Sequence, residues 1–177
     1  FWGLDKSLAS ARHFPSVNWL TSYSEYLDNV TEWWHTQTQM PWRELRAKAM
    51  QILNEEGHLD QIVKLVGPDA LPDEQRVTLE TARLLREAFL QQNAMDEIDT
   101  YSTPIKQIKM LDLILHFQAR AEVVVLQGAI ISAIQQLPII NSLIRMKSTV
   151  PNEELERLDE MRKSLDDQFD QLESVYQ

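Results

Sequence analysis

Cysteine is absent from the 177-residue sequence, and glycine occurs only 4 times. The lack of cysteine excludes disulfide bonds, thiolate zinc sites and cysteine nucleophiles, and it suits a reducing compartment. Scarce glycine, with plentiful Leu, Glu, Gln, Arg, Met and Ala, favours helices over a turn-rich β protein. Hydrophobic residues make up 44% and charged residues 25% of the chain, as in ordinary folded proteins. This length is sufficient for one domain with a sizeable core.

The few glycines form no phosphate-binding loop. The common nucleotide cradle has the pattern G-x-x-x-x-G-K-[ST], and none of the glycines precedes a lysine. The nucleophile-elbow pattern G-x-S-x-G is missing as well. We therefore expect this chain to hydrolyse no nucleotide on its own.

Positive charge is scarce, especially near the C-terminus. The net charge is −10, and residues 151–177 contain nine acidic and three basic residues. A nucleic acid backbone would be repelled, so we expect no nucleic-acid partner. An anionic membrane surface is disfavoured as a direct partner for the same reason.

One stretch without charge, residues 123–144, has roughly the length of a membrane-spanning helix. Polar residues recur through it at Gln127, Ser132, Gln135, Gln136 and Asn141. Gly128 and Pro138 interrupt it. The spacing favours amphipathic helices of a soluble protein over a membrane span.

Apolar residues spaced three or four apart predict a series of helices in the rest of the chain. Ser22 or Ser24 is the candidate N-cap of a helix over residues 25–36. Pro41 suits the first turn of the next helix, because the backbone N–H that proline lacks would have no partner within the helix there. The buried face of that helix is predicted at Leu45, Ala49, Ile52 and Leu53. Gly57 is expected to bend or break it.

Two further helices have clear N-terminal signals, at residues 71–74 and 102–104. Pro138 divides the following helical pattern in two. The last helix is predicted after Pro151, with a narrow apolar seam. This seam consists of Leu155, Leu158, Met161, Leu165, Phe169 and Leu172. The sequence thus predicts an all-α helical bundle with a short non-helical segment at its N-terminus.

The histidines and acids suggest no catalytic centre. Glu55 and His58 form one Glu-x-x-His, half of a di-iron motif, and no second copy exists. Asp112 and His116 stand four residues apart, which predicts an ion pair on a helix surface. Adjacent acids are more typical of solvated helix faces than of acid–base pairs. A stand-alone helical metalloenzyme is therefore disfavoured, and we predict no metal ligand.

Aromatic and amide residues are more suggestive. Aromatic side chains cluster between residues 14 and 42 and predict a packing layer, formed by Phe14, Trp19, Tyr23, Tyr26, Trp33, Trp34 and Trp42. Phe14 differs from the others because Pro15 restricts it to an extended loop conformation. The stretch "FLQQNAM", residues 89–95, ends a helical pattern with three amides and no charge. An aromatic ring beside such a helix end can stack on a planar ligand while the amides contact its edge.

Several long motifs resemble one family. "RHFPSVNWLTSYSEY", "LVGPDALP", "TARLLREAFLQQNAMDEIDTYSTPIKQ" and "LIRMK" are similar to the C-terminal part of the catalytic A subunit of archaeal A-type ATP synthases and of the vacuolar-type ATPase catalytic subunit. The opening "FWGLDKSLASARHF" starts without Met, so we expect a fragment of a larger protein. The resemblance implies that residues 1–20 end the nucleotide-binding domain, with its last strand and adenine-side loop. Residues 21–177 would be the C-terminal helical domain.

The same resemblance implies a site for ATP or ADP of which this chain forms the adenine side. Phe14 matches the family aromatic that stacks on adenine, and Gln91, Gln92 and Asn93 would line or brace the opposite wall. Met95 stands where the family has an aromatic residue, and its thioether can still pack on a purine. Amides suit a neutral base, whereas a charge there would cost desolvation. The P-loop, the catalytic glutamate and the Mg²⁺ site would lie before this chain, which leaves it no catalytic residue.

The resemblance also implies an assembly. Three A and three B subunits would alternate in a hexamer around central stalk subunits, and the helical domains would couple ATP synthesis or hydrolysis to rotation and ion transport. The complex would be cytoplasmic and peripheral, with the membrane reached only indirectly. The acids of residues 151–177 would either meet a basic stalk surface or form a solvated face. The alternative function is a free-standing helical protein-interaction module that binds through the terminal seam.

Overall fold

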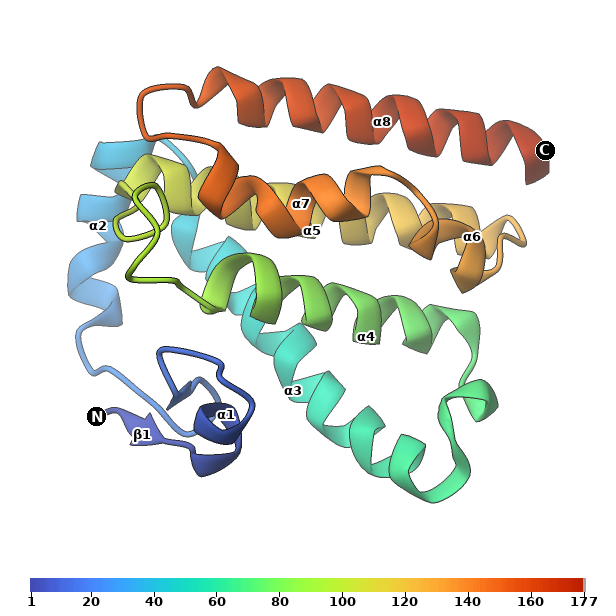
Figure 1. Ribbon diagram of the computed structural model, residues 1–177, viewed down its shortest axis with the longest axis horizontal. Coiled ribbons are helices and arrows are strands. Elements are labelled where there is room, and N and C mark those ends of the chain that lie inside the picture. The colour runs from blue at the N-terminus through green and yellow to red at the C-terminus, as the bar shows by residue number, and fades with distance from the viewer. Residues whose placement is uncertain (177) are drawn as a thin grey trace.

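The computed structural model describes residues 1–176 and is built almost entirely of helices (Figure 1). Its α-helices are α1 (Lys6–Ser10), α2 (Leu27–Thr38), α3 (Trp42–Val66), α4 (Asp73–Leu84), α5 (Pro104–Leu126), α6 (Ile131–Gln135), α7 (Ile139–Thr149) and α8 (Glu156–Tyr176). A 3₁₀ turn, η1 (Pro68–Ala70), precedes α4, and a π-helical turn, η2 (Leu85–Leu90), continues it. The predicted all-α fold is confirmed.

Helix α5 is the centre of the bundle and packs against α3, α4 and α8. Thr103 caps it by accepting a hydrogen bond from the Lys106 N–H, and Pro104 occupies its first turn, as the sequence predicts. Its fully or nearly buried residues include Ile108, Leu113, Ile114, Phe117, Ala121 and Val124. Each large aliphatic or aromatic side chain buried in this way stabilises the fold by about 1.5–3 kcal/mol.

Helix α3 runs without interruption through Gly57, so the predicted break there is wrong. A glycine inside a helix costs only about 0.5–1 kcal/mol relative to alanine. Leu53, Glu56 and Leu59 are buried on both sides of Gly57, and α3 packs along α4 over this part. Tertiary contact therefore outweighs the weak local signal. The buried face predicted for the first half of α3 is confirmed.

Helix α2 begins at Leu27, after the predicted start, and has no side-chain cap. Ser24 instead accepts a hydrogen bond from the Tyr26 N–H at 3.2 Å. The Ser22 hydroxyl donates to the Asn18 carbonyl and accepts from the Gly3 N–H at 3.0 Å. The prediction that one of these serines is the N-cap is therefore wrong, because both complete turns of the preceding segment.

The N-terminal segment is a small hairpin rather than an irregular stretch. Strand β1 (Gly3–Leu4) pairs antiparallel with β2 (Val17–Asn18), and the short α1 lies between them. Asp5 caps α1 by accepting from the Ser7 N–H at 2.8 Å. The prediction that this segment is non-helical is thus wrong over α1. The domain boundary after residue 20 stays a prediction.

The aromatic residues of the first third do not form one layer. Trp34 stacks on Trp42 with ring centroids 5.4 Å apart, and Trp33 meets Trp34 edge-on. Phe1 stacks on Tyr23 in a separate group. The hairpin and α2 thus place their aromatics in different groups, which corrects the predicted single layer.

Helix α8 lies along α5 and α7 at one side of the bundle (Figure 1). Leu158, Leu165 and Phe169 are buried, which confirms the predicted seam. The Phe169 ring meets Phe117 of α5 edge-on, with centroids 5.7 Å apart. The terminal helix is therefore an integral part of the core.

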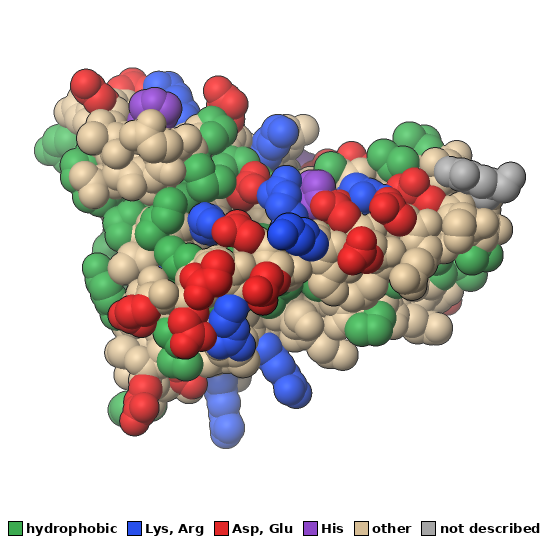
Figure 2. Space-filling view, turned by 90° about the horizontal axis from the view of Figure 1, so that it is seen from above, with side chains coloured by type: hydrophobic (Ala, Val, Ile, Leu, Met, Phe, Trp, Pro, Cys, Tyr) green, Lys and Arg blue, Asp and Glu red, His purple; other side chains and the backbone are tan. Residues whose placement is uncertain are grey.

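The acids of α8 form ion pairs with α5. Asp166, Asp170 and Glu173 all accept hydrogen bonds from Arg120, at 2.6–2.9 Å. Burial alone would lower the pKa of Arg120, but the hydrogen bonds to these carboxylates raise it above its ordinary value. Lys109 of α5 pairs with Asp159. Figure 2, which views the molecule from this side, accordingly shows acidic and basic side chains interleaved.

The predicted pair between Asp112 and His116 is wrong. His116 Nε2 lies 2.7 Å from Asp166 Oδ1, and Asp112 accepts from Arg162 of α8 at 2.6 Å. Both side chains thus turn toward the neighbouring helix, where they contact oppositely charged or polar groups.

The uncharged stretch of residues 123–144 is divided between the end of α5, the short α6 and the start of α7. Gly128 has a φ of 104°, a conformation that suits glycine, and it makes the turn after α5. Within residues 1–176, no helix is long and apolar enough to span a bilayer.

Candidate functional site

The loop that carries Phe14 and the amide turn after η2 lie side by side. The Gln92 N–H donates to the Phe14 carbonyl at 2.8 Å. Phe14, Gln91, Gln92 and Asn93 together line a pocket of about 350 Å³. Phe14 is 52% exposed, so its side chain is not covered by the rest of the protein. The structure thus brings four of the five predicted site residues together.

Met95 is the exception. Its side chain is 94% exposed and does not line the pocket. Its N–H donates to Asn93 Oδ1 at 3.0 Å, which places it one turn beyond the amides. In this structure Met95 therefore forms no second wall opposite Phe14.

The amide side chains bond to the protein backbone. Gln92 Nε2 donates to the carbonyls of Asp99 and Thr100 at 2.8 and 3.2 Å, which uses both of its N–H groups. Gln91 Nε2 contacts the Arg12 carbonyl at 3.4 Å. The amides therefore brace the loops that flank the pocket. Gln92 has only its side-chain oxygen left for a ligand.

The end of η2 is held by a lysine from another helix. Lys147 of α7 donates to the carbonyls of Glu87 and Gln91, both at 2.6 Å. Carbonyls at a helix end have no partner within the helix, and the ammonium group supplies one. Burial lowers the pKa of Lys147, while the charges of Asp99 and Glu87 oppose this shift.

The pocket is less neutral than the sequence predicts. Arg12, Asp96, Asp99 and Lys147 also line it, so the uncharged wall is confined to the three amides. Asp99 is 3% exposed and accepts from the Asn93 N–H at 2.6 Å. The charge of Asp99 acts on Lys147, which compensates part of the cost of burying these two groups.

A second lysine supports this arrangement. Lys106 of α5 is fully buried, and its Nζ donates to the Lys147 carbonyl at 2.9 Å. Burial lowers its pKa, and Asp99 and Asp96 act in the opposite direction. Sequence reasoning missed both lysines because they lie on α5 and α7, far from the amides along the chain. Both lysines lie within motifs that carry the family resemblance, residues 81–107 and 143–147, but nothing in those motifs relates them to the amides.

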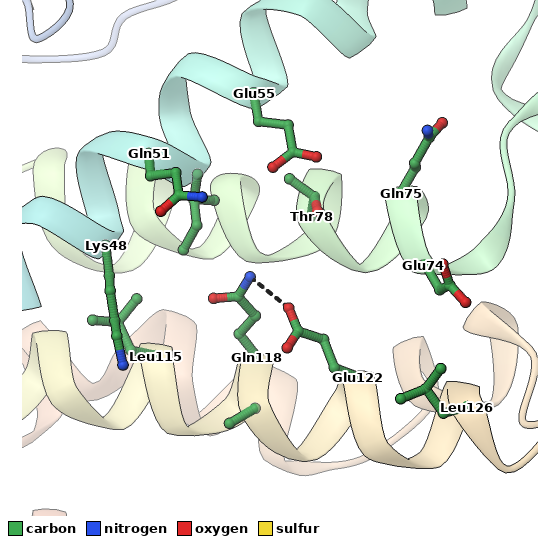
Figure 3. Close-up of a pocket in the computed structure, with 12 residues that line it drawn as sticks. Lys48, Gln51, Glu55, Glu74, Gln75, Thr78, Leu115, Gln118, Glu122 and Leu126 are labelled. Atoms are coloured by element: carbon green, nitrogen blue, oxygen red, sulfur yellow. Dashed lines mark hydrogen bonds between the residues drawn. The ribbon is translucent and has the colours of Figure 1, made fainter.

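A wider hollow of about 650 Å³ opens between α3, α4 and α5 (Figure 3). Lys48, Glu55 and Glu122 point toward it, and Gln118 donates to Glu122 at 2.9 Å. Among residues 1–176 no three His, Asp or Glu side chains form a group that could hold a metal ion. Within residues 1–176, this hollow therefore contains no metal-binding group of that kind.

The fold and the pocket define a class of protein: a helical bundle that packs against a small N-terminal hairpin, with a pocket of about 350 Å³ between the Phe14 loop and the end of η2. Comparison with known families identifies the class further. Residues 31–135 match the family described as the C-terminal domain of V and A type ATP synthase. The chain belongs to this family.

Individual relatives agree. The chain is 54% identical over 173 residues to the A subunit of the A-type ATP synthase of Methanopyrus kandleri, a match that covers 97% of this chain and 29% of the relative. It is 44% identical to the V-type ATP synthase alpha chain of Halothermothrix orenii over 100% of this chain and 30% of the relative. The corresponding A-type protein of Thermococcus onnurineus is 43% identical over 99% of this chain. The chain thus spans about three-tenths of the length of these relatives.

Proposed function

We propose that this chain acts as the helical part of the catalytic A subunit of an A-type or V-type ATP synthase and forms the adenine side of its ATP or ADP site. One observation carries the proposal. The Phe14 loop and the amide turn come from distant parts of the sequence, are joined by the Gln92–Phe14 hydrogen bond, and line one pocket. At this junction a planar base would contact both the Phe14 loop and the amide turn.

The contacts suit a neutral purine. The accessible Phe14 ring stacks on the base, and the amides offer neutral polar groups at its edge. Met95 takes part only if the loop beyond Asn93 moves, since its side chain lies outside the pocket lining. The triphosphate and Mg²⁺ would be held by the part of the protein that this chain does not span.

In the assembled enzyme, this domain would lie beside B subunits in an alternating A₃B₃ hexamer and move with the central stalk. The complex would be cytoplasmic and attached to the membrane only through its other subunits. Nucleotide contacts at Phe14 and at the end of η2 join the hairpin to the helical bundle. Occupancy of the site would therefore bias the position of the bundle. Nucleotide contacts that differ between two positions of the bundle are what coupling of the site to movement requires.

The alternative, a free-standing module that binds partners through the terminal seam, is less well supported. Leu158, Leu165 and Phe169 are buried against the rest of the bundle, so this seam has no free apolar face. Three acids of α8 are also engaged in ion pairs with Arg120. A partner would have to displace contacts that stabilise the fold.

The decisive test is Phe14→Ala in the full-length protein within its enzyme. We expect ATP binding to weaken by about 1–3 kcal/mol, the usual contribution of one base–aromatic stack. Tyr26→Ala is the matched control, because Tyr26 is 68% exposed and lines no part of the pocket. Equal ATP affinities for wild type and Phe14→Ala, measured by equilibrium titration, would remove Phe14 from the site.

Gln91→Ala tests the amide wall. We expect a smaller loss of ATP affinity than for Phe14→Ala, since one hydrogen-bonding group contributes about 0.5–1.5 kcal/mol. The informative measurement is the ratio of ATP to GTP affinity. A ratio that does not change would show that Gln91 braces the loop without contacting the base.

A further inference from the structure

Both walls of the pocket are attached to one backbone carbonyl. The Arg86 carbonyl accepts from the Gln91 N–H at 2.8 Å, the bond that closes the π-helical turn at the start of the amide wall. The same oxygen lies 3.2 Å from His13 Nε2, and His13 immediately precedes Phe14. One acceptor therefore fixes the distance between the residue next to the ring and the amide turn.

The chemistry of this contact determines which ring nitrogen of His13 is the donor. A carbonyl oxygen can only accept, so the ring carries a proton on Nε2. His13 is 8% exposed and lies against Trp19, with ring centroids 5.6 Å apart. Within residues 1–176, His13 Nδ1 is buried and has no hydrogen-bond partner. An apolar side chain at this position would leave no buried polar atom unpaired, whereas histidine leaves its Nδ1 unpaired. The hydrogen bond of Nε2 is the contact that an apolar side chain could not make, and it therefore accounts for a histidine here.

The shared carbonyl is itself held in place. The Arg86 side chain forms an ion pair with Glu56 of α3, whose side chain is 10% exposed. Arg86 therefore connects the middle of α3 to the two walls of the pocket. With this anchor, the His13 bond helps to position the Phe14 loop, together with the Gln92 N–H bond to the Phe14 carbonyl.

We propose that His13 is a positioning residue for nucleotide binding, which sets the Phe14 ring against the amide turn through its Nε2–H bond to the Arg86 carbonyl. This inference rests on the proposed function, since the ligand is the adenine nucleotide assigned to the pocket. His13 touches no nucleotide and acts only through Phe14.

Two amide substitutions in the full-length protein test the proposal. His13→Gln places an amide nitrogen near the position of Nε2, so it keeps the donor and should retain ATP affinity within about twofold. His13→Asn has the same chemistry but is one methylene shorter and does not reach the carbonyl. It should raise the Kd for ATP about fivefold, as expected for one lost neutral hydrogen bond. His58→Asn on the exposed face of α3 is the control for a histidine change outside the pocket.

A double-mutant cycle separates positioning from general destabilisation. If His13 acts through the Phe14 ring, His13→Asn should raise the Kd for ATP almost no further when Phe14 is already Ala. Additive losses would overturn the proposal, as would equal ATP affinity for wild type and His13→Asn. If His13→Asn fails to assemble, His13→Gln alone decides: retained affinity supports the proposal, and weakened affinity overturns it.

The cycle also separates this inference from the proposed function. A loss with Phe14→Ala but none with His13→Asn refutes the role of His13 and leaves the adenine site intact. No loss with Phe14→Ala refutes the adenine site itself, and the role of His13 with it.

Discussion

The contact of α8 with α5 and the contact of the N-terminal hairpin with η2 are built from different groups. Helix α8 is held by side chains, namely the Phe117–Phe169 ring pair and the ion pairs of Arg120. The hairpin is held near the pocket by bonds to backbone carbonyls, those of Arg12, Phe14 and Arg86. Side-chain contacts give the bundle its stability, whereas backbone contacts set the geometry of the pocket.

This difference has a physical consequence. An apolar seam contributes through buried area, and small shifts along it cost little as long as the packing is retained. A hydrogen bond to a carbonyl loses strength steeply when the distance or angle changes. We therefore expect substitutions in the seam to change the free energy of unfolding, and substitutions near the pocket to change ligand affinity.

The largest effect should come from Phe169→Ala in α8. Phe169 is fully buried, so its removal should lower the free energy of unfolding by about 3–5 kcal/mol. Urea denaturation followed by circular dichroism measures this change. Val175→Ala, at a position 74% exposed, should change it by less than about 0.5 kcal/mol. A loss below about 1 kcal/mol for Phe169→Ala would mean that α8 is not part of the core.

Arg120→Gln should have the next largest effect. It leaves Asp166, Asp170 and Glu173 close together without their shared cation, so we expect a loss of about 2 kcal/mol, the range for hydrogen bonds to charged groups. Added salt should reduce the loss. Arg157→Gln is the control, since its pair with Glu154 is exposed. Equal destabilisation by both variants would contradict a special role for the α5–α8 ion pairs.

Gln92→Ala should have a local effect near the pocket, where the hairpin meets η2. It removes both hydrogen bonds to the loop carbonyls of Asp99 and Thr100, so this loop should open more often. Amide hydrogen exchange of Ile98 and Asp99 should become about fivefold faster, as for the loss of one net hydrogen bond. The urea midpoint should shift little. Exchange that is faster throughout the bundle would instead place Gln92 in the global core.

The smallest effect concerns Asp5 and acid. Hydrogen bonds from the Ser7 hydroxyl, from Asn18 and from the Ser7 N–H lower its pKa to about 2 from an ordinary value of 3.8. The folded state therefore binds this proton less readily than the unfolded state. The stabilisation by Asp5 is present above pH 3.8 and is lost as the pH falls toward about 2. Carboxyl titration of Asp5 by NMR should give a midpoint well below the ordinary value of 3.8, and a midpoint near 3.8 would refute the cap.

Much of the bundle could be predicted from the sequence, and the reasons are local. Pro104 after Thr103 and the spacing of Leu158, Leu165 and Phe169 carry their structural meaning within a few residues.

Other predictions failed where contacts between helices determine the local structure or the partner of a side chain. Gly57 does not break α3, because the packing of α3 on α4 outweighs the local preference of glycine. Asp112 and His116 do not pair, because each has a closer partner on α8. Neighbours across helices are set by the fold and not by spacing along the chain.

By itself the sequence determined the helical class, the neutral character of the 91–93 amides and the family likeness, because composition, periodicity and motifs are properties of the chain read in order. Only the tertiary structure decided that Lys147 lies beside those amides with Lys106 bonded to its carbonyl, and that His13 and Gln91 share the Arg86 carbonyl. The physical reason is that every residue has the same backbone carbonyl, so the sequence does not show which carbonyl will accept a hydrogen bond. Its partners become visible only when segments distant in the sequence are brought together.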